Sequence, residues 1–149
     1  ESQLDRFLLR IQLGYPDAQA ERDLLAGRDP RELLADMEPG MDSETLLTLQ
    51  RQCTQIFASP ALLEYVQAIL RYTRESGQYR HGLSPRAGLS LLNAARAWAM
   101  LDGRSAVIPE DIQAVLPGIC AHRLQSAQSL RTIDSDRLAQ ALIEAVAIP

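Results

Sequence analysis

The stretch SPRAGLSLLNAARAWAML, residues 84–101, decides the fold because it is the strongest helix-forming segment of the chain. Ser84 is a natural N-cap, and Pro85 suits the first helical position. Apolar residues then recur at helical spacing on one face: Leu91, Leu92, Ala95, Trp98 and Ala99. We therefore expect a helix over 84–101 that packs this face, Trp98 included, into a core.

Arg86 falls in the first turn of this expected helix, where the helix dipole disfavours a cation. The N–H groups of that turn carry partial positive charge, and a guanidinium beside them suits a phosphate. We interpret Ser84, Pro85 and Arg86 as a candidate anion-binding helix start. The alternative is an exposed arginine without a ligand.

Capping residues and apolar spacing predict further helices on both sides of this stretch. They span about 42–56, 59–77, 107–119 and 134–146, with Asp134 as the cap of the last. Pro117-Gly118 should kink or split the helix over 107–119, because proline lacks the N–H donor that a helix interior uses. The fold class expected from residue 42 onward is an all-α bundle of about five helices.

The residues before the bundle follow another pattern. Residues 6–13 alternate between polar and apolar side chains, which is the period of a half-buried strand. A strand cannot stand alone, so we expect its sheet to lie outside these residues. Asp17 can then cap a short helix to about Leu25. Residues 26–41, rich in Gly, Pro and acids, predict a linker with one helical turn.

The composition excludes several functions. With 15 basic residues against 19 acidic ones and a net charge of −4, the chain lacks the dense basic surface of a nucleic-acid module. All 15 basic residues are arginine, so neither a P-loop lysine nor a Schiff-base lysine is present within this chain. Cys53 and Cys120 lie far apart with no metal-ligand spacing near them. We expect two buried free thiols and no metal site.

The remaining signals concern location and catalysis. No apolar run approaches the length of a membrane span, and no leader is present, so we expect a cytoplasmic protein. The chain begins at Glu1 without an initiating Met, and we expect it to be a piece of a longer protein. His81 and His122 belong to no triad or metal pattern, so these residues alone are not expected to form a complete catalyst.

Several ordered segments resemble the C-terminal part of MoxR-type AAA+ ATPases, which are ring-forming ATPases linked to the assembly of metalloenzymes and other complexes. The matching segments are ESQLDRFLLR (1–10) with GYP (14–16), GLSPRA (82–87), AARAWA (94–99), LDGR (101–104), VIPEDIQ (107–113) and AHRL (121–124). They keep their order from one end of the chain nearly to the other. One departure is Ile108, which stands where the family often has a capping threonine.

The resemblance implies a division of the chain and two roles. Residues 1–25 would end the nucleotide-binding core, 26–41 would link, and 42–149 would form the helical lid that closes over nucleotide. Arg86, with Ser84 and Pro85 before it, matches the lid arginine called sensor 2, which points at the nucleotide phosphates. Arg6 matches the arginine finger, which reaches the nucleotide of the neighbouring subunit.

The resemblance further implies ATP and Mg²⁺ as cofactors of the full-length protein, with neither bound tightly to this segment alone. It implies ATP hydrolysis, chaperone-like maturation of other proteins, and a homo-oligomeric ring, expected to be a hexamer, whose client proteins the sequence does not identify. The alternative function is a helical protein–protein interaction module whose arginines bind an acidic partner. A helix-turn-helix DNA reader is opposed by the acidic charge balance.

Overall fold

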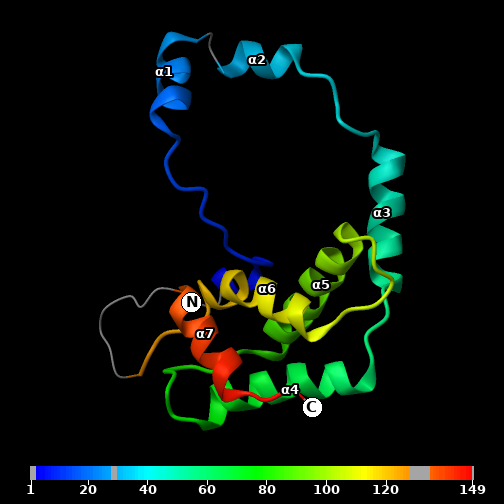
Figure 1. Cartoon of the computed structure of the whole chain (residues 1–149), viewed down its shortest axis with the longest axis vertical. Helices are drawn as coiled ribbons and strands as arrows, with labels where there is room; N and C mark the ends of the chain where they lie inside the picture. Colours follow the sequence, from blue (N-terminus) through cyan, green and yellow to red (C-terminus); the bar gives the residue numbers. More distant parts are fainter. Residues whose placement is uncertain (1–2, 28–29, 128–134, 149) are drawn as a thin grey trace. The chain divides into compact units, whose positions relative to one another are not determined.

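The computed structural model describes residues 3–27, 30–127 and 135–148, and within these ranges the secondary structure is helical. Figure 1 shows the elements in chain order: η1 (Leu4–Arg6), α1 (Ala18–Ala26), α2 (Pro30–Asp36), α3 (Ser43–Gln55), α4 (Pro60–Glu75), α5 (Pro85–Leu101), α6 (Pro109–Cys120) and α7 (Ser135–Ala145). The predicted all-α class is confirmed. The five helices from α3 onward correspond to the five that the sequence predicts, while the expected cap Asp134 lies outside the described residues.

The chain divides into two compact units. One comprises residues 12–49, in which Asp17 caps α1 by accepting hydrogen bonds from the backbone N–H groups of Gln19 and Ala20 at 3.0 and 2.8 Å. The other comprises residues 1–11 and 50–149 and is called the bundle unit below. The core side chains all belong to the bundle unit. The functional boundaries expected at residues 25 and 41 stay a prediction.

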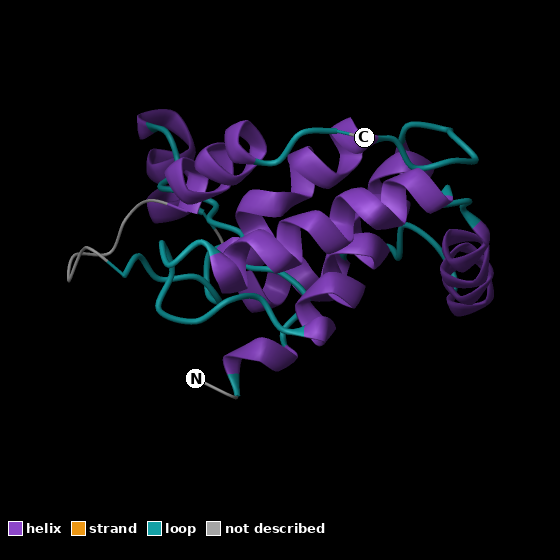
Figure 2. Ribbon diagram, turned by 90° about the horizontal axis from the view of Figure 1, so that it is seen from below, coloured by secondary structure: helices purple, strands orange, loops and turns teal. Residues whose placement is uncertain are grey.

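Helix α5 packs against α4 and α6, and α6 also packs against α4 and α7. Figure 2 shows the described part of the chain as helices joined by loops. Small residues allow the close approach of α5 to α4. A Cβ at Gly88 would lie only 2.7 Å from a methyl group of Leu70. The core side chains that are fully buried include Tyr65, Ile69, Leu91, Ile112, Leu116, Ile119 and Leu142.

One side chain of α5 departs from the prediction. Trp98 is 47% exposed, so the expectation that it belongs to the core is wrong. It falls in the last turn of α5, where the neighbouring Ala99 is fully buried and the elements around the helix end leave half of the indole in solvent.

The strand expected over 6–13 stays a prediction, because the sheet that would pair with it is expected outside these residues. Residues 7–13 are not paired as a strand with any described segment. Leu9 is half-buried, but Ile11 and Leu13, expected on the same face, are exposed. Alternation records only that one face can be covered, whereas a strand also needs a paired neighbour, and no named strand occurs in residues 3–27, 30–127 or 135–148.

Helix α6 is continuous through Pro117, so the predicted split does not occur. The proline removes only the one hydrogen bond that its own N–H would make to the carbonyl four residues back, and the helix continues to Cys120. The exposed carbonyls of this turn are also used: Ala121 N–H donates to Pro117 at 2.9 Å, and Arg10 N–H donates to Gly118 at 2.9 Å. A Cβ at Gly118 would lie 3.1 Å from the Arg10 carbonyl oxygen, so this close approach depends on glycine.

The connection from α5 to α6 is held by an ion-pair cluster. Arg104 donates through both terminal nitrogens to the carboxylate of Asp111, which is only 2% exposed, and also to Asp102 at 3.0 Å. The Asp111 carboxylate accepts a further bond from Ile108 N–H at 2.9 Å. Asp111 therefore supplies, from the third helical position, a side-chain bond at the helix start that Ile108 cannot make.

Candidate anion-binding helix start

The loop before α5 is fixed by α4. Leu83 donates its N–H to the hydroxyl of buried Thr73 at 3.0 Å, and its carbonyl accepts from Arg74 Nε at 2.8 Å. Gly82 permits this approach, because a Cβ there would lie 2.8 Å from the Arg74 Cα. Both backbone groups of Leu83 are thus held, and they set the position at which α5 begins.

The first turn of α5 is capped as the sequence predicts. The hydroxyl oxygen of Ser84 accepts from Ala87 N–H at 3.1 Å, and Gly88 N–H donates to the Ser84 carbonyl at 3.2 Å. Pro85 at the first position has no N–H to satisfy. Within the described part of the chain, the backbone N–H of Arg86 has no hydrogen-bond partner.

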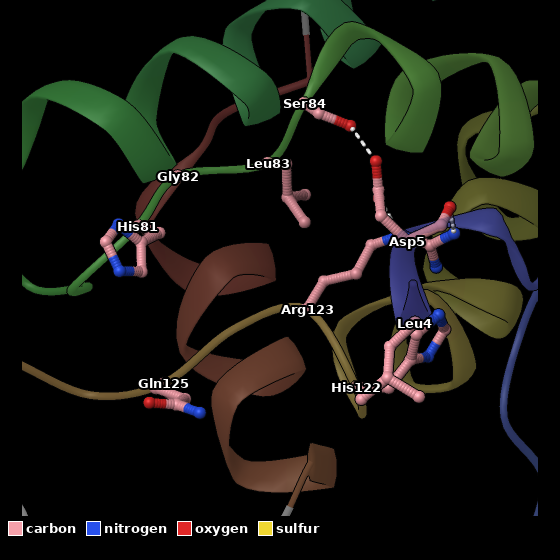
Figure 3. A pocket seen from close by; sticks show the side chains of 9 residues that line it. All are labelled: Leu4, Asp5, His81, Gly82, Leu83, Ser84, His122, Arg123 and Gln125. Atoms are coloured by element: carbon pink, nitrogen blue, oxygen red, sulfur yellow. Dashed lines mark hydrogen bonds and ion pairs between the residues drawn. The ribbon is translucent and has the colours of Figure 1, made fainter. Parts of the chain in front are cut away.

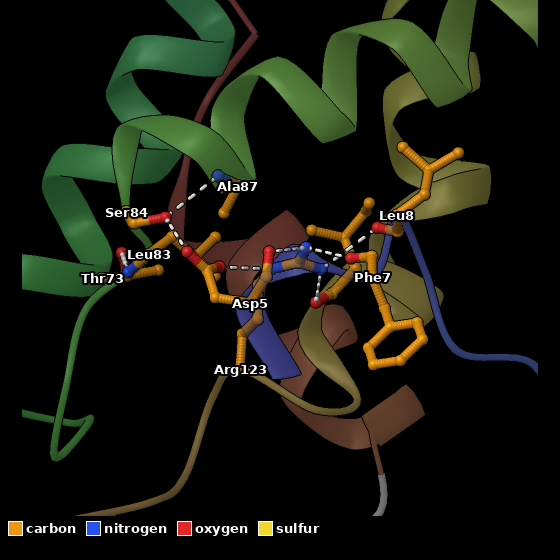
Figure 4. Close-up of polar contacts among 9 residues, drawn as sticks. Asp5, Phe7, Leu8, Thr73, Leu83, Ser84, Ala87 and Arg123 are labelled. Atoms are coloured by element: carbon orange, nitrogen blue, oxygen red, sulfur yellow. Dashed lines mark hydrogen bonds and ion pairs between the residues drawn. The ribbon is translucent and has the colours of Figure 1, made fainter. Parts of the chain in front are cut away.

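The same serine also reaches the N-terminal segment. Ser84 donates its hydroxyl proton to Asp5 Oδ2 at 3.0 Å, and Asp5 Oδ1 accepts from Arg123 Nε at 2.9 Å (Figure 4). Burial by itself raises the pKa of the Asp5 carboxyl, but these two hydrogen bonds and the charges of Arg123 and Arg86 outweigh it. The pKa of Asp5 therefore lies below its ordinary value of 3.8, and the group is a carboxylate at neutral pH.

Arg123 is the centre of this contact set, and its side chain is only 4% exposed. Besides Asp5 Oδ1, the guanidinium donates to the carbonyl oxygens of Asp5, Phe7, Leu8 and Ile119. One arginine from the end of α6 therefore holds the η1 turn and the two residues after it.

A cavity of about 210 Å³ adjoins this contact set (Figure 3). Asp5, Ser84 and Arg123 contribute to its polar lining, and the rest of its lining includes Leu4 and His122. Burial lowers the pKa of His122 below 6.5, and the positive charge of Arg123 acts in the same direction. The imidazole is therefore neutral at pH 7.

The predicted residues lie as follows. Ser84, Pro85 and Arg86 come together at the start of α5, and the exposed Arg86 side chain has no hydrogen bond or ion pair among the described residues. Arg6 ends η1 and is exposed, next to Asp5. The roles expected for Arg6 and Arg86 stay predictions.

Asp5 and Arg123 were missed as functional candidates by reasoning from spacing, because they are 118 residues apart. Their only signal was that each stands within a segment that carries the family resemblance, LDRF and AHRL.

Comparison with known proteins identifies the family of this chain. Residues 71–144 match the family described as the AAA lid domain. The chaperone MoxR1 of Mycobacterium tuberculosis (strain ATCC 25618 / H37Rv) is 36% identical over 135 residues, which cover 83% of this chain and 35% of MoxR1. The protein MoxR of Methylorubrum extorquens is 36% identical over 141 residues, covering 80% of this chain and 40% of that protein. The chain belongs to the MoxR-type AAA+ family.

One further relative and one solved structure match nearly the whole of this chain. YeaC of Bacillus subtilis (strain 168), a protein of uncharacterized function, is 33% identical over 151 residues, covering 100% of this chain and 47% of YeaC. The crystal structure of a candidate ATPase from Cytophaga hutchinsonii matches the fold with a TM-score of 0.79 at 23% identity, over 99% of this chain and 48% of that one. The chain therefore spans less than half the length of each of these relatives.

The start of α5 offers donors that suit an anion. Arg86 offers a free guanidinium and a free backbone N–H at a helix start, which is the donor set that a phosphate uses. In the described ranges, no group of three or more His, Cys, Asp or Glu side chains could hold a metal ion. In the same ranges, no helix is both long and apolar enough to span a bilayer.

Proposed function

We propose that this lid closes over ATP bound by the same subunit, and that Arg86 contacts the nucleotide phosphates there. The observation that carries the proposal is the exposed Arg86 guanidinium, whose charge acts on Asp5 but which makes no hydrogen bond or ion pair with the described residues. It lies at a helix start beside its own backbone N–H, which also has no partner among them. Elsewhere in the bundle unit, Arg104 and Arg123 are paired with carboxylates. A cation left unpaired against an unfavourable helix dipole supports an anionic ligand.

ATP and Mg²⁺ would supply the phosphoryl-transfer chemistry in the full-length protein, in which this segment contributes only the lid side. Arg86 would bind and orient phosphate oxygens, and Arg6 would contribute positive charge to the site of a neighbouring subunit in a homo-oligomeric ring. We propose a hexameric, chaperone-like ATPase, in keeping with the name of the relative MoxR1. The cytoplasmic location stays a prediction.

The interaction-module alternative is not favoured. It calls for an apolar groove remote from Arg86, whereas the groove between α4 and α5 is lined by Pro85 and Gly88, one residue before and two residues after Arg86, together with Leu63 and Leu89. Indifference of all activities to Arg86 would restore that alternative.

The test is ATP turnover and size-exclusion behaviour of the full-length protein with Arg86→Ala. We expect turnover to fall about 100-fold or more, as for removal of a charge-stabilising donor, with an unchanged melting temperature. Arg71→Ala, which removes another exposed arginine from α4, is the matched control and should leave turnover unchanged. Wild-type turnover and assembly in a folded Arg86→Ala protein would refute the proposal.

A further inference from the structure

Asp5 stands between the two arginines to which the proposed function gives roles. It directly precedes Arg6 in η1, and its carboxylate accepts a hydrogen bond from Ser84, two residues before Arg86. Ser84 uses the same hydroxyl oxygen to cap α5 at Ala87. The path from the start of α5 to η1 thus consists of one hydrogen bond between side chains, at 3.0 Å.

The other end of this path is held firmly. Arg123 binds the second carboxylate oxygen of Asp5 and the carbonyl oxygens of Asp5, Phe7 and Leu8. Because the Arg123 side chain is buried, water cannot readily replace these acceptors around its guanidinium. One oxygen of the Asp5 carboxylate is therefore held by Arg123, and the other is held only by Ser84, so a displacement of Ser84 can turn the carboxylate.

We propose that Asp5 is a positioning residue that couples Arg86 to Arg6, so that a change at the start of α5 is passed to η1. The inference rests on the proposed function, because it gives Arg86 a nucleotide in its own subunit and Arg6 one in the neighbouring subunit. Lid closure in one subunit then repositions Arg6, which reaches the nucleotide of the neighbouring subunit. Asp5 itself touches no reacting group.

The discriminating variant is Ser84→Asp in the full-length protein. Aspartate caps a helix as well as serine does, so the first turn of α5 is retained, but the new carboxylate repels Asp5 instead of donating to it. Adding Asp5→Asn restores a donor at that contact and keeps an oxygen for Arg123, while leaving the extra charge in place. Ser59→Asp is the matched control, since Ser59 caps α4 before Pro60 in the same way, through Leu62 N–H at 3.1 Å.

The readout is hydrogen–deuterium exchange with and without a non-hydrolysable ATP analogue, together with kcat and KM for ATP. In the wild type and in Ser59→Asp, we expect the analogue to slow exchange both at the start of α5 and in residues 4–9. The carboxylate in Ser84→Asp stands in the proposed anion site and should raise KM, so the comparison is made at saturating analogue and ATP. There, Ser84→Asp should keep the first effect, lose the second, and lower kcat about 10-fold to 100-fold, the scale expected from misplacing a catalytic group. The double variant should regain the second effect and most of kcat.

The two proposals fail in different ways. If the analogue leaves the start of α5 unprotected in the wild type and Arg86→Ala keeps full turnover, the proposed function is refuted, and the coupling with it. If Arg86→Ala abolishes turnover but Ser84→Asp protects residues 4–9 like the wild type, the coupling alone is refuted. If Ser84→Asp does not fold, Asp5→Ala replaces it, because that variant keeps the Arg123 bonds to the backbone carbonyls.

Discussion

Asp111→Ala is the substitution for which the structure predicts the largest loss of stability in the α5–α6 connection. The buried carboxylate accepts both terminal nitrogens of Arg104 and the N–H of Ile108. Removing the carboxylate leaves the N–H of Ile108 without a side-chain acceptor, which costs about 1 kcal/mol of stability. The loss of the two charge-assisted bonds from Arg104 costs about 2 kcal/mol more, a modest amount because Arg104 is partly solvated and keeps its bond to Asp102. We expect unfolding to be easier by about 3 kcal/mol, at the low end for breaking a buried pair.

The assay is urea unfolding of the 149-residue chain, followed by the fluorescence of its single tryptophan, Trp98, at the end of α5. With a denaturant slope of about 2 kcal/mol per M, the midpoint should fall by about 1.5 M. Asp102→Ala removes the other partner of Arg104, but Asp102 is 64% exposed, so that change should cost below about 1 kcal/mol. Equal shifts in the two variants would refute the argument that burial of Asp111 makes its pair strong.

Two further predictions concern pH and packing. Because the pKa of His122 is lower in the folded chain than in the unfolded chain, the unfolded chain binds more protons as the pH falls, and the stability of the fold should decrease below about pH 6.5. His122→Gln removes this imidazole and should flatten the decrease in melting temperature between about pH 7.5 and 5.5. The same decrease in the variant as in the wild type would contradict the argument. Gly82→Ala should lower the melting temperature by about 5 °C, because the new Cβ would clash with backbone atoms of Arg74. Gly40→Ala is the control and should leave the melting temperature unchanged, because its Cβ meets nothing within 4 Å. Equal melting temperatures of the two variants would exclude the clash.

The helices were predictable because their signals are local. Ser59 and Ser84 cap helices at the positions that the sequence indicates, and both are followed by proline. Pro117 misled the prediction because the continuation of a helix past a proline depends on how the helix packs in the core and on contacts such as the N–H of Arg10, more than 100 residues away in sequence. Local patterns carry no information about either.

The candidate site was only partly predictable for the same reason. The three consecutive residues Ser84, Pro85 and Arg86 suffice to predict both the helix cap and the unfavourable position of Arg86 in the helix dipole. The contact between Asp5 and Arg123 arises from tertiary packing, in which the end of α6 meets the N-terminal segment. The alternation after Arg6 is a local signal as well, but no described segment pairs with these residues, so the strand expected there stays a prediction.

Arg123 recognises the N-terminal segment mostly through main-chain oxygens, at Asp5, Phe7 and Leu8. These hydrogen bonds do not depend on which side chains stand at positions 7 and 8. Phe7 and Leu8 are also exposed, so substitutions at both can accumulate during evolution without loosening the attachment. The segment beside Arg6 can therefore diversify to suit different neighbours, while Asp5, the one position that Arg123 contacts through its side chain as well, is constrained.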